Sequence, residues 1–173
     1  ITKYTGDLRY ILEWVEKEFR KSIYIYAHSM GTMVTSLLSP DNIKKVILGV
    51  ASNNSPEHYI ERIKKRIESK GGTFDLDGIS IYPRTSGQIQ KIGPVFWQSL
   101  KQLKPLEIVA KLTGKTKLLM IRAKQDEIID SQFLDEYKQA PNLRYLELDG
   151  SHSFVGPADR EIFIKEIKDF FLN

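Results

Sequence analysis

The sequence predicts an α/β protein with a mostly parallel, doubly wound sheet that is interrupted by an inserted segment. Short apolar runs alternate with amphipathic helical patterns over residues 1–52, and the same alternation resumes over residues 114–173. Strands that alternate with helices in this way form parallel sheets covered by helices. Residues 53–113 break the alternation, so we expect them to form a cap inserted into the core. The length of 173 residues suits one domain with a real core.

The first core segment predicts two helices and two strands. Residues 5–20 predict an amphipathic helix that covers the sheet, because apolar side chains recur at helical spacing, namely Leu8, Ile11, Leu12, Val15 and Phe19. Residues 23–26 predict a short buried strand, and residues 30–38 predict a helix that ends before Pro40. Residues 45–51 form a nearly continuous apolar run, which is typical of a central parallel strand.

The expected cap carries its own helices and a hairpin. Residues 56–69 predict a helix with an isoleucine-rich face and a charged face. Residues 73–82 contain two alternating runs around Asp77-Gly78, which predicts a β-hairpin because Asp-Gly tolerates the positive φ angles of a two-residue turn. Residues 95–103 and 105–112 predict two short helices.

The second core segment restores the alternation of strands and helices. Residues 116–123 and 143–148 predict strands. Residues 131–139 predict a helix capped by Ser131, and residues 158–172 predict a terminal amphipathic helix.

Composition and charge narrow the classes of partner. The 26 basic and 22 acidic residues are mixed along the chain and give a net charge of +4, so nucleic acid is not expected as a partner. No apolar run approaches the roughly 20 residues that cross a bilayer, so we expect no stable membrane insertion. The chain has no cysteine, which rules out disulfides and thiolate catalysis and favours a cytoplasmic location. Its three histidines are too far apart in sequence to predict a metal site.

The chain begins with Ile1 rather than methionine and enters a predicted helix almost at once. We therefore expect it to be the C-terminal part of a longer protein.

The segment Ala27-His28-Ser29-Met30-Gly31 joins the first predicted strand to the helix that follows. A serine at the apex of such a turn presents its hydroxyl at the carboxyl edge of the sheet. Small residues at Ala27 and Gly31 are expected to let strand and helix pass closely. The alternative role of Ser29 is an ordinary helix N-cap, which serine favours.

This segment resembles the nucleophile elbow of the α/β-hydrolases, written G-x-S-x-G, with Ala27 in place of the first glycine. The family's catalytic residues follow in the order serine, acid, histidine, each after a strand. Asp126 in RAKQDEII and His152 in LDGSHSF stand at the matching places. The resemblance implies a fold of the α/β-hydrolase type and a triad of Ser29, Asp126 and His152, in which histidine is the base and the carboxylate orients it.

Other polar residues remain open as alternatives. Asp130 or Glu127 is an alternative third member of the triad, whereas Asp149 lies too near His152 in sequence to be preferred. His28 is expected to pack or form a hydrogen bond, and His58 to lie in the cap facing solvent or substrate.

The resemblance also implies an oxyanion hole with two backbone N–H donors. Met30, directly after the serine, supplies one, and the other normally comes from an earlier loop outside this chain. The cap resembles the lid of bacterial esterases that hydrolyse hydroxycinnamoyl esters, and also that of the monoacylglycerol lipase and serine aminopeptidase branch. Tyr82, Phe96 and Trp97 are candidates to line an acyl pocket, and packing inside the cap is their alternative role.

The expected function is hydrolysis of a small-molecule carboxylic ester through an acyl-enzyme intermediate, with no metal or organic cofactor. The alternative is a catalytically idle binding or scaffold module that lacks half of the oxyanion hole. Haloperoxidase or lyase chemistry on the same scaffold is a third interpretation, because one fold hosts many reactions. The sequence gives no prediction of the oligomeric state.

Overall fold

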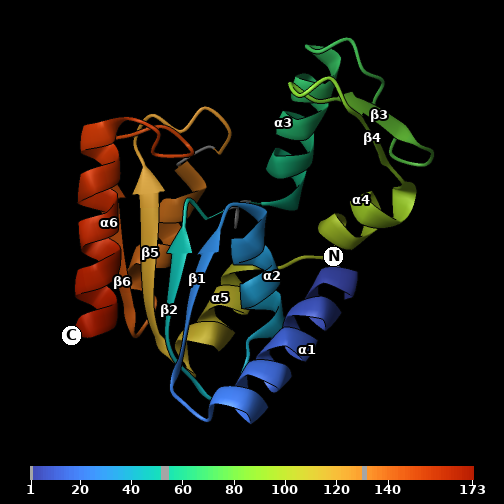
Figure 1. Ribbon diagram of the computed structural model, residues 1–173. Helices are drawn as coiled ribbons and strands as arrows, with labels where there is room; N and C mark the ends of the chain where they lie inside the picture. Colours follow the sequence, from blue (N-terminus) through green and yellow to red (C-terminus); the bar gives the residue numbers. More distant parts are fainter. Residues whose placement is uncertain (1, 52–54, 130–131) are drawn as a thin grey trace. The chain divides into compact units, whose positions relative to one another are not determined.

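The structure is a computed structural model that describes residues 2–51, 55–129 and 132–173 (Figure 1). Its chain divides into two compact units. The larger unit comprises Thr2–Asn54 and Pro105–Asn173, and the smaller unit comprises Ser55–Lys104. The smaller unit therefore ends at Lys104, earlier than the predicted cap boundary at residue 113.

The larger unit is built on a parallel sheet of four strands, in the order β1-β2-β5-β6 (Figure 1). All three pairings in it are parallel, which confirms the predicted fold class. Because the strands are parallel, their carboxyl ends meet at one edge of the sheet. The strands are β1 (Ile23–His28), β2 (Ile43–Gly49), β5 (Lys117–Ala123) and β6 (Leu143–Leu148).

Helices lie on both faces of this sheet, with α6 on one face and α1, α2 and α5 on the other (Figure 1). They are α1 (Thr2–Phe19), α2 (Met30–Leu38), α5 (Pro105–Thr113) and α6 (Pro157–Leu172), and a 3₁₀ helix, η1, spans Gln132–Gln139. The predicted helices agree with these bounds to within a few residues, although η1 is 3₁₀ rather than α. The predicted cap residue Ser131 lies outside the described residues.

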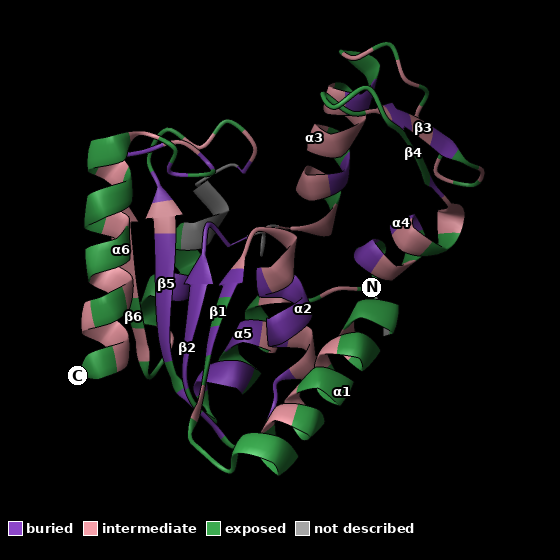
Figure 2. Ribbon diagram, viewed as in Figure 1, coloured by how far each residue is buried: buried purple, intermediate pink, exposed green. Residues whose placement is uncertain are grey.

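Alternate residues of the central strands fill two core layers. Figure 2 shows β2 and β5 buried along nearly their whole length. One layer contains Val46, Leu48, Leu118 and Met120 and includes Val109 and Leu112 of α5. The other contains Ile47, Leu119, Ile121 and Phe154, against which Phe163, Ile167, Phe170 and Phe171 of α6 pack. Strands buried on both faces read as continuous apolar runs, which explains the pattern in the sequence.

The smaller unit contains two helices and a two-stranded sheet, namely α3 (Pro56–Glu68), β3 (Ser80–Pro83), β4 (Ile89–Ile92) and α4 (Pro94–Lys101). The antiparallel hairpin is formed by β3 and β4. Its turn ends at Gly87, whose φ of 82° suits glycine. The backbone N–H of Gly87 donates to the carbonyl of Arg84, and that of Arg84 to the carbonyl of Gln88.

The hairpin predicted within residues 73–82 is therefore wrong in its turn. The chain does reverse there, but Thr73 meets Ile81 only in an isolated antiparallel bridge. The reason is the side chain of Asp75, whose Oδ1 accepts hydrogen bonds from the backbone N–H groups of Asp77 and Gly78. An aspartate that bonds to the backbone two or three residues ahead stabilises a wider loop and competes with a two-residue turn.

Lys45 of β2 is a buried lysine whose ammonium group bonds to the C-terminal end of helix α6. The residue is only 9% exposed. Its Nζ donates to the carbonyl oxygens of Phe170 at 2.9 Å and Phe171 at 3.4 Å, and lies 5.6 Å from the centroid of the Phe170 ring. The last carbonyls of a helix have no partner within the helix, and this ammonium provides a partner for two of them.

We expect Lys45→Met to lower the free energy of unfolding by about 1–3 kcal/mol, because charged hydrogen bonds are lost while the apolar stem is kept. Equilibrium urea unfolding measures this change. The control is Lys44→Met, at an exposed neighbouring position of the same strand, which should change stability by less than about 0.5 kcal/mol. Equal effects of the two substitutions would show that Lys45 does not stabilise the end of α6.

Candidate active site

Ser29 is the single residue between β1 and α2, and its backbone is strained. It has φ 52° and ψ −124°, a conformation that residues with a side chain rarely adopt. Its N–H donates to the carbonyl of Gly49 in β2 at 3.1 Å. Its carbonyl accepts from the N–H and the hydroxyl of Thr32 at 3.0 and 2.6 Å. These bonds hold the turn in place from the strand side and from the helix side.

The hydroxyl of Ser29 does not cap helix α2. Ser29 occupies the N-cap position, but its side chain makes no capping hydrogen bond. Instead, its Oγ lies 2.9 Å from Nε2 of His152. The alternative role as an ordinary N-cap is therefore wrong.

The expected need for a small residue at Gly31 is not supported. A Cβ placed on Gly31 would meet no described atom within 4 Å outside its own helix. Ala27, near the end of β1, is buried. The tight geometry of the turn therefore depends on the backbone of Ser29 rather than on space at Gly31.

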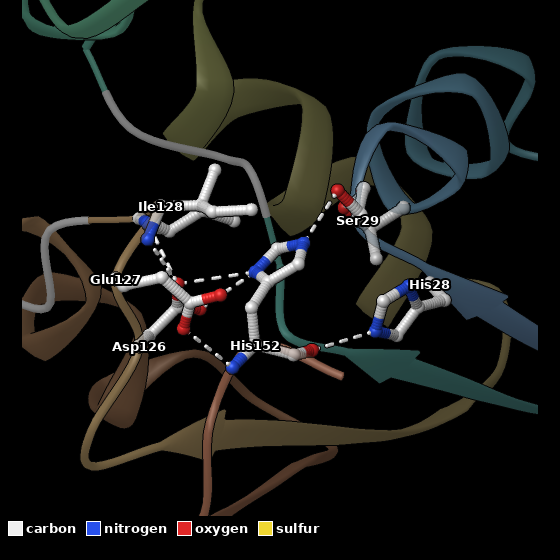
Figure 3. Close-up of polar contacts among 8 residues, drawn as sticks. His28, Ser29, Asp126, Glu127, Ile128 and His152 are labelled. Carbon is white, nitrogen blue, oxygen red and sulfur yellow. Dashed lines mark hydrogen bonds and ion pairs between the residues drawn. The ribbon is translucent and has the colours of Figure 1, made fainter. Parts of the chain in front are cut away.

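His152 lies in the loop after β6, and its imidazole side chain is only 6% exposed. Gly150 shapes this loop, because its φ is 141° and a Cβ there would lie 2.5 Å from the ring of Phe154. Nδ1 of His152 is 2.9 Å from Oδ2 and 3.1 Å from Oδ1 of Asp126. The imidazole therefore bridges the serine hydroxyl and the carboxylate (Figure 3).

Asp126 follows β5, and its side chain is 5% exposed. Its Oδ1 also accepts the backbone N–H groups of Ile128 at 2.7 Å and Ile129 at 2.8 Å. Burial alone would raise the pKa of this carboxyl. Hydrogen bonds from His152, Ile129 and Ile128, with the charge of His152, outweigh burial and lower the pKa below 3.8. Asp126 is therefore ionised at neutral pH.

The alternative acids that the structure describes do not bond to the imidazole of His152. Glu127 contacts His152, but its Oε2 accepts the backbone N–H at 3.1 Å rather than bonding to the imidazole. The carboxylate of Asp149 is exposed and pairs with Lys124 and Gln125. Asp130 lies outside the described residues. Among the described acids, the carboxylate that contacts the imidazole is that of Asp126.

His28 forms a hydrogen bond, as expected, but its partner is the main chain of His152. Nε2 of His28 lies 3.0 Å from the carbonyl oxygen of His152, and the two rings meet edge-on with centroids 5.2 Å apart. Burial lowers the pKa of His28. Its hydrogen bond to His152 and the charge of Asp126 oppose that effect only in part. Sequence reasoning did not predict the main-chain partners of His28 and Glu127, although both residues adjoin triad candidates.

Two further residues near the same edge have positive φ angles. Val50, directly after β2, has φ 54°, and Phe154, in the loop after His152, has φ 46°. Both are buried, and a positive φ is especially rare for a β-branched residue such as valine. Strain of this kind gathers at functional sites.

Met30 is the first residue of α2. The first N–H groups of a helix have no partner within the helix and carry a partial positive charge. The N–H of Met30 follows Ser29 directly and belongs to this set.

The three candidate pocket residues belong to the smaller unit. Trp97 is buried, its indole N–H donates to Oγ of Ser80 at 3.2 Å, and its ring contacts Phe74 and Phe96. Tyr82 is buried, with Lys70 and Arg84 over its ring. These contacts agree with packing inside the unit, and a role in an acyl pocket stays a prediction. His58 of the same unit donates its backbone N–H to Oγ of Ser55.

No group of three or more His, Cys, Asp or Glu side chains in the described ranges is arranged to hold a metal ion. None of the helices in the described part of the chain combines the length and apolar character of a membrane span.

No protein-family model and no curated protein matches the sequence, but solved structures do. The chain is 22% identical to Est1E from Butyrivibrio proteoclasticus, with a TM-score of 0.73. The match covers 99% of this chain and 69% of the Est1E chain. The chain is 18% identical to the esterase domain of a Rhodothermus marinus protein, with a TM-score of 0.64, over 90% of this chain and 62% of that one. An alpha/beta hydrolase from Novosphingobium aromaticivorans is also 18% identical, with a TM-score of 0.54, and this match covers 91% of this chain and 68% of that one.

The chain thus spans 62–69% of the length of these three structures. At such identities a likeness in structure shows the fold. With its parallel sheet and the strand–turn–helix at Ser29, the chain forms part of an α/β-hydrolase fold.

Proposed function

We propose that this protein is a serine hydrolase that cleaves carboxylic esters through an acyl-enzyme intermediate. The observation that carries this proposal is the continuous contact from Ser29 Oγ through the His152 imidazole to the Asp126 carboxylate, with 2.9 Å at each end. A serine hydroxyl is a weak nucleophile until a neighbouring base removes its proton, and this arrangement supplies the base.

The reaction begins when Ser29 Oγ attacks the ester carbonyl carbon and its proton passes to Nε2 of His152. Asp126 accepts a hydrogen bond from Nδ1–H and stabilises the imidazolium. The tetrahedral intermediate carries a negative oxygen, to which the N–H of Met30 donates. As the intermediate collapses, the carbon–oxygen bond of the ester breaks and His152 protonates the departing alcohol. Water then repeats the sequence on the acyl-serine, releasing the acid and restoring Ser29.

We further propose esters of aromatic acids as substrates. One structure similar to this chain is described as ferulic acid bound to Est1E, and the chain is 20% identical to it, with a TM-score of 0.71 over 97% of this chain and 66% of that one. Ferulic acid is a hydroxycinnamic acid. Hydroxycinnamoyl esters are also the substrates of the bacterial esterases whose lid the predicted cap resembles. In this proposal Phe96 of the smaller unit, which is only partly buried, is the candidate for contact with the acyl group, whereas Tyr82 and Trp97 are buried within that unit.

Ser29→Ala should lower kcat for an activated aryl ester about 10⁴-fold or more, because the nucleophile is lost. A fluorophosphonate should add once to the wild-type protein, at Ser29, and not to the variant. Intact mass and peptide mapping measure this adduct, and circular dichroism checks that the variant is folded. A wild-type protein that takes no adduct and hydrolyses no ester would instead be an idle hydrolase-like module.

Ser29→Gly should be as inactive as Ser29→Ala but more stable. Relief of strain at φ 52° is worth about 1–3 kcal/mol, and the greater freedom of glycine in the unfolded chain offsets about 0.5–1 kcal/mol of it. Urea unfolding of the two variants measures the difference. If the glycine variant were the less stable of the two, the backbone at Ser29 would not be strained.

Asp126→Asn should make the stability of the protein less dependent on pH in the acid range. The pKa of Asp126 is lowered below 3.8 in the folded protein, so its ionised form adds stability above that value, which is lost as pH falls through the folded pKa. The wild type should therefore be the more stable protein at pH 7, and its advantage should shrink at pH 3.

Urea unfolding of both proteins at the two pH values measures this change. A difference in stability that is the same at pH 7 and pH 3 would contradict the lowered pKa. The same variant should lower kcat about 10⁴-fold at neutral pH, because an amide does not fix the required tautomer of His152.

A further inference from the structure

His152 is held at four points by two pairs of adjacent residues (Figure 3). Ser29 and Asp126 bond to its ring. Their sequence neighbours bond to its backbone, because Glu127 accepts the N–H and His28 lies at hydrogen-bond distance from the carbonyl oxygen. Each pair thus contributes one contact to the imidazole and one to the backbone of His152.

We infer that Glu127 and His28 are positioning residues that fix the backbone of His152, so that its imidazole stays aligned between Ser29 and Asp126. The inference rests on the proposed function for its effect on turnover, although the geometry can be tested without it. The two residues act through His152 and touch no reacting atom.

Glu127 completes a series of bonds between the loop after β5 and the loop after β6. The backbone N–H of Lys124 donates to the carbonyl of Leu148, and that of Gln125 to the carbonyl of Gly150. The side chain of Gln125 accepts the N–H of Gly150 in return. The carboxylate of Glu127 then reaches the N–H of His152 at 3.1 Å. The two loops are therefore joined from the strand ends as far as the histidine itself.

His28 holds the other side of the same residue. A carbonyl oxygen only accepts, so Nε2 of His28 must carry the hydrogen in the bond to His152. His28 belongs to β1, which pairs with β2 at Gly49. The bond therefore ties the loop of His152 to the strand that directly precedes Ser29, whereas Glu127 ties it to the loop that contains Asp126.

The loop of His152 needs such support because its backbone is unusual on both sides of the histidine. Gly150 has φ 141° and Phe154 has φ 46°. A small displacement of the histidine backbone would be passed to the ring. A misplacement of about 1 Å in a catalytic group can reduce turnover about 100-fold.

Paired substitutions of similar size, one that keeps the hydrogen bond to His152 and one that removes it, separate the effect of the hydrogen bond from the effect of side-chain size. Glu127→Gln keeps an acceptor oxygen, whereas Glu127→Met has a similar length and none. His28→Gln keeps a donor near the position of Nε2, whereas His28→Phe keeps the ring and loses the donor. Glu161→Met, at an exposed position of α6, is the control for introducing methionine.

The first readout is turnover of an aryl ester. We expect Glu127→Met and His28→Phe to lower kcat about 10- to 100-fold with little change in KM, because alignment rather than substrate binding is lost. Glu127→Gln and His28→Gln should recover most of this loss. A purely structural role would not be rescued by the hydrogen-bonding variant while leaving KM unchanged.

The second readout needs no substrate. The proton shared by His152 Nδ1 and Asp126 should give a low-field proton NMR signal in the wild type that is absent from His152→Gln. We expect Glu127→Met and His28→Phe to broaden or remove this signal, and Glu127→Gln and Glu161→Met to keep it.

Loss of the signal in Glu127→Met and its retention in Glu127→Gln would support the positioning role even if the wild type hydrolysed no ester, in which case only the proposed function would fail. An intact signal with kcat within about 2-fold of wild type in both Glu127→Met and His28→Phe would overturn the inference while leaving the proposed function standing.

Discussion

The parallel alignment of the four strands is the constraint on which the rest of this structure depends. Parallel strands end at the same edge, so residues far apart in the sequence follow β1, β5 and β6 into neighbouring loops. Backbone bonds extend this alignment beyond the strands, from Ser29 to Gly49 and from Gln125 to Gly150. The contacts among Ser29, Asp126 and His152 therefore rest on sheet pairing and on the two core layers beneath it.

Strain at this edge is maintained by bonds that a relaxed loop would lose. Ser29 and Val50 keep positive φ angles. The N–H of Ser29 reaches Gly49, and the N–H of Val50 reaches Ile121 at 2.7 Å. Each strained residue is thus bonded to the next strand of the sheet. A strained conformation costs of order 1–3 kcal/mol, and the buried strands beneath supply the packing that offsets this cost.

The order of strands and helices in the larger unit could be predicted because it depends on local pattern. The three contacting residues Ser29, Asp126 and His152 were expected from the resemblance of the segment around Ser29 to the nucleophile elbow and from the chain order that this resemblance implies. The hairpin turn could not, because Asp75 competes for the backbone N–H groups of the Asp-Gly pair. The predicted cap boundary at residue 113 differs from the end of the smaller unit at Lys104. The periodicity of residues 105–113 predicts a helix with an apolar face but does not show which core that face joins. In the structure Val109 and Leu112 pack against the sheet. The partners of Glu127 and His28 are peptide groups of a distant loop. Every residue has a peptide group, so the sequence does not show which one a side chain will contact.

The hydrogen bonds of Asp126 determine where a proton can go in the proposed reaction. Its Oδ1 accepts two backbone N–H groups, and both oxygens lie within 3.1 Å of His152 Nδ1. These donors favour the charged form strongly enough to outweigh burial and lower its pKa. A carboxylate with a lowered pKa is a poor proton acceptor, so in the proposed reaction the proton taken from Ser29 stays on the imidazole. It is then available to a leaving group on the serine side, and this is why a buried acid can orient the base without competing with it.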